Sequence, residues 1–174
     1  IGGDRVLNVG TLTGAGEIDG NDVSVDPAVR RMLTINQTAV DPAVKRTLTI
    51  NQTGASTYAG SITGVLDLVK NGVGTLTLTG TNAYAGLGRV EAGTLVIGTP
   101  AAMDVQNDYR VYDQATLRID SSTGLVTGDV VTVDDRGFLE VDSAFGITSL
   151  TNPGLSTVDA ALEISTYLAN TATG

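Results

Sequence analysis

The sequence predicts an all-β protein, a β-solenoid of about seven or eight coils that spans residues 1–174 as a single domain. Three observations predict this fold. A Leu-polar-aliphatic motif recurs along the chain, and its last four steps are 19, 22, 22 and 23 residues. Clusters of turn-forming residues separate the copies, with no helix-length periodic segment between them. The chain has 22 Gly and only 4% aromatic residues, which suits thin aliphatic layers better than a core of large rings.

Each copy of the motif is predicted to form one half-buried strand. Because side chains alternate along a strand, Leu117 and Ile119 point to one face and Arg118 and Asp120 to the other. Stacking coils about 4.8 Å apart pairs their backbone groups and places Leu on Leu. The copies are LTI at Leu33 and Leu48, LTL at Leu76, LVI at Leu95, LRI at Leu117, LEV at Leu139 and LEI at Leu162, with LNV at Leu7 as a less regular earlier copy. An antiparallel β-sandwich is the alternative, but its strands recur about every 8 to 12 residues.

A tandem duplication occupies residues 26–53. DPAVRRMLTINQT (26–38) and DPAVKRTLTINQT (41–53) differ at two of thirteen positions and are offset by 15 residues. This offset is short for a full coil, so smaller or irregular rungs are expected here. The duplication also repeats the basic pairs Arg30-Arg31 and Lys45-Arg46. They are either plain surface charge or a cationic patch for contacts between copies of the chain.

The C-terminal segment STVDAALEISTYLANTATG is predicted to end in a strand, because ALEIS matches TLRID and FLEVD in form and spacing. An amphipathic helix capped by Ser156 is the alternative. Residues 101–174 carry eleven acidic and three basic side chains, and so hold most of the net charge of -9. This balance repels phosphate backbones, so nucleic acid is not an expected partner.

Composition also limits the chemistry of the chain. It contains no Cys and no His, so it has no disulfide, no thiolate or imidazole metal ligand, and no histidine general base. No run of eighteen apolar residues predicts a membrane-spanning helix. The chain starts at Ile1 and shows no polar cap, so we expect a processed subunit that self-associates or part of a longer solenoid.

Residues 58–98 resemble the passenger-associated strand repeat of bacterial autotransporters. The matching elements are Tyr58 with Gly60, the run from Lys70 to Leu78, Gly80, the run from Asn82 to Gly86, Val90, and the run from Ala92 to Leu95. The resemblance implies a right-handed parallel β-helix, secreted and displayed on the bacterial surface, that works as stalk or scaffold. The chain departs from the family in the tandem DPAV segment and in the lack of a C-terminal membrane barrel within these 174 residues.

An acidic group in the C-terminal coils is the candidate for a calcium site or a catalytic acid pair. It consists of Asp134, Asp135, Glu140 and Asp142. Alternation places Glu140 and Asp142 on one outward face, where carboxylates could hold calcium or serve a lyase or hydrolase. Such a lyase also needs a base, and Arg118 and Arg136 are the nearby basic residues. Solvated surface charge is the simpler interpretation, so no catalytic residue and no cofactor is predicted.

Four tyrosines are candidate platforms for glycans: Tyr58, Tyr84, Tyr109 and Tyr112. Tyr58 and Tyr84 belong to the repeat, and packing at a coil corner is the expected use of both. The sequence therefore predicts a non-enzymatic extracellular structural protein: a surface stalk, adhesive scaffold or self-assembling filament subunit. A β-helix polysaccharide lyase or hydrolase and a glycan-binding adhesin are the alternatives, and the expected partners are further copies of the chain and host surface or matrix glycans.

Overall fold

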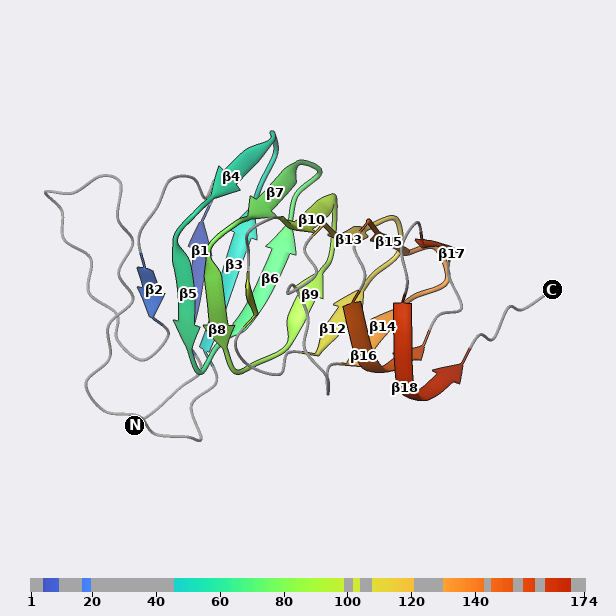
Figure 1. Cartoon of the computed structure of the whole chain (residues 1–174). Coiled ribbons are helices and arrows are strands. Elements are labelled where there is room, and N and C mark those ends of the chain that lie inside the picture. The colour runs from blue at the N-terminus through green and yellow to red at the C-terminus, as the bar shows by residue number, and fades with distance from the viewer. Residues whose placement is uncertain are drawn as a thin grey trace, which may run out of the picture.

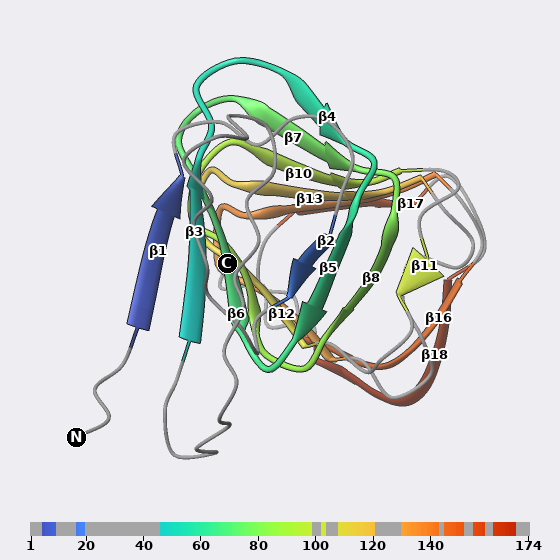
Figure 2. The same ribbon diagram turned by 90° about the vertical axis from the view of Figure 1, so that its left-hand side faces the viewer.

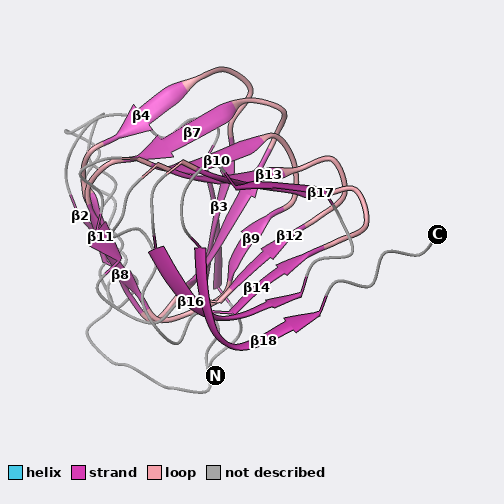
Figure 3. Cartoon of the chain, turned by 45° about the vertical axis from the view of Figure 1, so that its right-hand side comes forward, coloured by secondary structure: helices cyan, strands magenta, loops and turns pink. Residues whose placement is uncertain are grey.

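A computed structural model describes the backbone of residues 5–9, 17–19, 46–98, 102–103, 108–120, 130–142, 145–151, 155–158 and 162–169. Side chains are described over 46–98, 108–120 and 130–142, and at Thr151. Within these residues the chain contains strands and loops only (Figure 3). No helix of the described part is long and apolar enough to cross a membrane.

The strands form three parallel sheets, which are the three faces of the solenoid (Figures 1 and 2). Sheet A has the order β1 (Arg5–Val9), β3 (Arg46–Asn51), β6 (Asp67–Asn71), β9 (Gly88–Val90), β12 (Tyr109–Val111), β14 (Val130–Val133), β16 (Phe145–Thr151) and β18 (Leu162–Ala169). Sheet B has the order β17 (Leu155–Val158), β15 (Phe138–Val141), β13 (Thr116–Ile119), β10 (Thr94–Ile97), β7 (Thr75–Leu78) and β4 (Ser56–Tyr58). Sheet C has the order β11 (Ala102–Met103), β8 (Thr81–Tyr84), β5 (Ser61–Gly64) and β2 (Glu17–Asp19).

One coil takes one strand from each sheet in turn, as β6, β7 and β8 do. The next coil begins at β9, which pairs in parallel with β6 in sheet A. This is the predicted all-β solenoid of parallel strands. The described coils make about four turns, so the predicted number of seven or eight coils stays a prediction. β18 confirms that the C-terminal segment forms a strand and not a helix.

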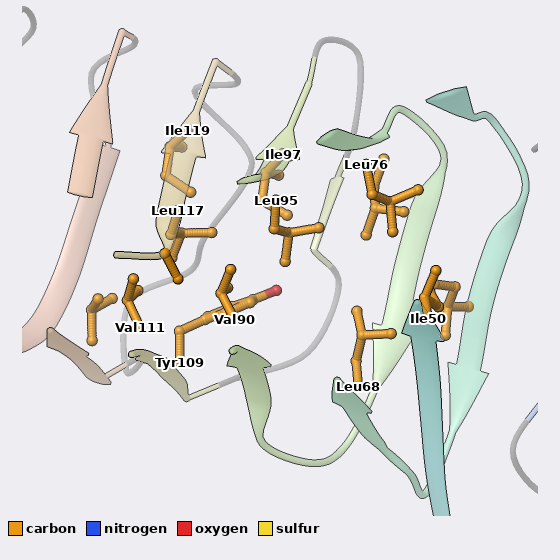
Figure 4. Packing of buried hydrophobic residues seen from close by; sticks show 14 of the residues in the cluster. Ile50, Leu68, Leu76, Val90, Leu95, Ile97, Tyr109, Val111, Leu117 and Ile119 are labelled. Atoms are coloured by element: carbon orange, nitrogen blue, oxygen red, sulfur yellow. The ribbon is translucent and has the colours of Figure 1, made fainter. Parts of the chain in front are cut away.

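The predicted ladder of Leu on Leu is confirmed in sheet B. Leu76 pairs with Leu95, Leu95 with Leu117, and Leu117 with Leu139. All four side chains are fully buried. A second column runs beside them through Ile97 and Ile119, and Figure 4 shows both columns in the interior. The aliphatic residue two positions after each Leu therefore also stacks on its counterpart.

Three copies of the motif lie in the other large sheet, which corrects the prediction of one continuous ladder. Leu48 is in β3 of sheet A, where its partners are Leu7 and Leu68. Leu162 is in β18 of sheet A, whereas Ser156 of β17 is the residue opposite Leu139. Both sheets bury alternate aliphatic residues, so the motif marks an inward-facing strand without specifying its sheet. Leu33, with the first copy of the duplication, lies outside the described residues.

Glycines bring the corners of successive coils into direct backbone contact. A Cβ at Gly80 would lie 2.0 Å from the carbonyl oxygen of Gly60, and one at Gly86 would lie 2.0 Å from that of Leu66. Gly72 and Gly93, at corners between sheets A and B, have φ of 78° and 67° in the left-handed region. Glycine is therefore needed at these corners for both space and backbone conformation.

Candidate functional site

The repeat places a lysine inside the solenoid. Lys70 is the fourth residue of β6, and alternation puts it on the inner face with Leu68. Its strand partners are Ile50 in the coil before and Val90 in the coil after, so it interrupts an aliphatic column. Its relative exposure is 0%. A buried ammonium is costly unless hydrogen bonds replace its water.

Backbone carbonyls at the sheet A to sheet B corner supply those hydrogen bonds. The Lys70 Nζ atom donates to the carbonyl oxygens of Asn71 at 3.1 Å, Gly72 at 2.8 Å and Ala92 at 2.9 Å. The first two belong to the coil of Lys70 and the third to the next coil, so the side chain ties two corners together. Burial lowers the pKa of Lys70 to about 8. With no exposed atom for a substrate to reach, this group serves the fold.

Two other buried polar side chains support neighbouring coils. Asn82 accepts a hydrogen bond from the Ile62 backbone at 3.2 Å and donates to the Gly80 carbonyl at 2.8 Å. Gln52 donates to the Gly54 carbonyl at 3.0 Å. These residues, and Lys70, were not singled out as buried polar groups from the sequence. The sequence does contain one signal for the burial of Lys70: side chains alternate along a strand, so Lys70 lies on the same inward face as Leu68.

The tyrosines divide into buried and surface-facing groups. Tyr58, Tyr84 and Tyr109 are almost fully buried, which confirms the structural use expected for Tyr58 and Tyr84. Tyr112 is half-buried, and the Arg110 guanidinium lies over its ring at 4.9 Å from the centroid. Among the tyrosines whose side chains are described, Tyr112 is the one that is not buried.

The four acidic candidates do not come together as one site. They are Asp134, Asp135, Glu140 and Asp142, and no group of three acidic side chains in the described residues could hold a metal ion. Asp134 follows β14 of sheet A and pairs with Arg110 at 3.2 Å. Asp142 follows β15 of sheet B and pairs with Arg118 at 2.8 Å. Although these carboxylates are close in sequence, Asp134 and Asp142 lie at the ends of strands in different sheets. Each of the two pairs with an arginine.

Ion pairs join neighbouring coils on the outer surface. Arg89 contacts Asp67 at 3.2 Å, and Arg136 donates through Nε to Asp113 at 3.1 Å. Both proposed bases, Arg118 and Arg136, are thus engaged with carboxylates, and a guanidinium stays protonated in proteins. The Asp120 hydrogen bond raises the pKa of Arg118 further. Arg118 and Arg136 are therefore held as partners of carboxylates of the solenoid itself.

Replacing Arg136 by alanine should raise the pKa of Asp113 toward its ordinary value, because the Arg136 hydrogen bond is the main cause that lowers it. Both side chains are largely exposed, so stability should not change measurably. NMR titration of the Asp113 carboxyl group tests this, with Arg118→Ala as the control that leaves the pair intact. An unchanged pKa of Asp113 in Arg136→Ala would contradict the assignment.

The predicted basic patch is described at one residue only. Arg46 begins β3 on the inner face beside Leu48 and is 5% exposed. Arg30, Arg31 and Lys45 lie outside the described residues. Contacts between copies through these residues therefore stay a prediction.

The coils that contain Lys70 and Tyr84 are similar to known proteins. Residues 68–97 match the passenger-associated-transport-repeat family. The adhesin BmaC autotransporter of Brucella suis biovar 1 (strain 1330) is 34% identical over 82 residues, which are 47% of this chain and 2% of that relative's length. No solved structure matches the chain. The resemblance of this region to the autotransporter passenger repeat is confirmed.

Proposed function

We propose that this chain is a rigid scaffold segment of an autotransporter passenger, a solenoid that holds adhesive surfaces away from a bacterial cell. Its passenger repeat indicates display at the cell surface or outside the cell. The adhesin relative supports an adhesin-like, non-enzymatic role. We further propose that the coil is right-handed, as the resemblance implies, and that it continues through the seven or eight coils predicted from the sequence.

The observation that carries the scaffold proposal is the location of the repeat's own side chains. Lys70, Leu76, Leu78 and Tyr84 each have 0% exposure. A Cβ at Gly74 would overlap the backbone of the preceding coil. A repeat that served recognition would carry its distinctive side chains on the outer face. Here they face the interior or a neighbouring backbone, so they support stacking.

Removal of one complete coil tests the proposal. Deleting residues 67–87 takes out β6, β7 and β8 together and lets β9 stack on β3 in the same sheet. In bacteria that display the full-length passenger, we expect this variant to be displayed and to adhere normally. Deleting residues 67–78 is the matched control, because it removes β6 and β7 but leaves β8 and should prevent folding.

The two deletions separate a scaffold from an adhesive surface. Limited proteolysis of intact cells reports display and folding, and an adherence assay on host cells reports function. If the complete-coil deletion is displayed and protease-resistant but no longer adheres, these coils make the adhesive contact themselves and the scaffold proposal is wrong.

A further inference from the structure

Two tyrosine hydroxyl groups meet inside the solenoid. The Oη atoms of Tyr84 and Tyr109 are 2.7 Å apart, at hydrogen-bond distance, and the residues are 25 positions apart in sequence. Tyr84 ends β8, in the coil that begins with β6, and Tyr109 begins β12 two coils later. Their relative exposures are 0% and 1%. The pair thus spans the intervening coil in a region that excludes water.

Gly88 makes this meeting sterically feasible. It is the residue of the intervening coil that lies opposite Tyr109 in sheet A. A Cβ on Gly88 would lie 2.4 Å from Cε1 of the Tyr109 ring, so the ring occupies the space of the missing side chain. Figure 4 shows the Tyr109 side chain extending past Val90 toward the preceding coils. A larger residue at position 88 would push the ring away from Tyr84.

We propose that Tyr84 and Tyr109 are a latent cross-linking site, at which a one-electron oxidant joins the two rings into dityrosine. Each phenol loses one electron to the oxidant and one proton, which gives two phenoxyl radicals. The radicals combine through a new carbon–carbon bond between ring positions ortho to the oxygens, and the ring hydrogens at those carbons move to the oxygens. In sum, two tyrosines lose two electrons and two protons to give one dityrosine, and the oxidant takes up the electrons.

The arrangement favours coupling within this pair. The 2.7 Å separation of the two phenol oxygens holds the rings as neighbours, and the dityrosine product keeps its two hydroxyl groups adjacent. Burial prevents either ring from meeting a tyrosine of another molecule. Electrons can leave a buried ring by transfer over a short distance, so the oxidant need not touch it. A chain displayed outside the cell also meets such oxidants without the reducing protection of the cytosol.

Covalent coupling would fasten together coils that are otherwise held by stacking. A cross-link between distant positions restricts the unfolded chain, as a disulfide does. This chain has no Cys, so a tyrosine pair is a chemically available alternative. The inference does not depend on the scaffold role, since it concerns only two described side chains and their contact.

The test uses the full chain with photo-activated ruthenium tris-bipyridyl and persulfate as the one-electron oxidant. We expect dityrosine fluorescence in the monomer, a linked peptide containing positions 84 and 109 that has lost two hydrogen atoms, and a higher Tm. Tyr84→Phe and Tyr109→Phe should each abolish the linked peptide. Tyr112→Phe is the matched control, because it removes the hydroxyl group of a half-buried tyrosine outside the pair and should leave the internal link unchanged.

The readouts also distinguish the site from random oxidation. Circular dichroism verifies that each Phe variant folds, and oxidation in denaturant should lose selectivity for the pair. If the folded chain couples only between molecules, or if linked peptides lack position 84 or 109, the proposal is wrong. Formation of the 84–109 link in denaturant as efficiently as in the folded chain would also overturn it, because the fold would then contribute nothing.

Discussion

Gly74→Ala should lower the free energy of unfolding by about 3 kcal/mol or more, as severe overpacking does. Its Cβ would lie 2.1 Å from the carbonyl oxygen of Gly54 and 2.6 Å from the Gly54 backbone nitrogen. The clash is with backbone, so no side chain can rotate away to relieve it. Gly74 also donates its N–H to the Gln52 carbonyl at 2.9 Å, which ties the same corner to the preceding coil. Relief would require the two coils to separate locally.

Gly54→Ala is the matched control for this prediction. Gly54 belongs to the equivalent corner of the preceding coil, but a Cβ there has no atom within 4 Å. We therefore expect a change of about 0.5 kcal/mol or less, as at ordinary surface positions. Urea unfolding followed by circular dichroism measures both variants. Equal stability of the two would show that corner backbones are not in the close contact described here.

Lys70→Met should remove a rise in stability between pH 8 and 10.5. The pKa of Lys70 in the native state is about 8, below the ordinary value of 10.5. Between these values the unfolded chain binds more protons than the native chain, so the free energy of unfolding increases with pH. The full increase is about 3 kcal/mol, since one pKa unit corresponds to about 1.4 kcal/mol. Methionine keeps an unbranched chain without a titrating group.

The quantity to compare is the difference in the free energy of unfolding between the wild type and Lys70→Met at each pH. Tyrosines also titrate at high pH, but they are present in both proteins. Urea unfolding at pH 7, 8, 9 and 10 gives stability curves for the wild type and for Lys70→Met. Arg118→Met serves as the control, since it removes a surface cation that stays protonated throughout this range. Its curve should run parallel to the wild type. A Lys70→Met curve that also runs parallel would mean that the native pKa of Lys70 is not lowered.

Much of the architecture could be predicted from strand patterning. The inward positions Leu95 and Leu117 follow from alternation, and their stacking follows from the nearly constant spacing of the motif. The assignment of each strand to a sheet could not be predicted this way. Leu48 and Leu139 occur in similar short motifs, yet they lie in different sheets, because both sheets bury alternate aliphatic residues and the motif is compatible with either.

The acidic group illustrates a second limit of sequence reasoning. Asp134 and Asp142 are eight positions apart, which suggested a common site. A corner separates them in the structure, and each carboxylate meets an arginine from the coil before. Partners about one coil apart in sequence are nearest neighbours in a solenoid. Local clusters of charge are therefore poor guides to binding sites in this fold.

By itself the sequence determined the strand period, the inward aliphatic residues and the stacking role of the repeat, because these depend on local alternation and on spacing. Only the tertiary structure decided what lies beside each inward side chain. It placed the Lys70 ammonium against carbonyls of two corners, and it brought Tyr84 to Tyr109 across the space that Gly88 leaves open. Such contacts depend on the path of whole coils, which corner geometry sets and short motifs do not encode.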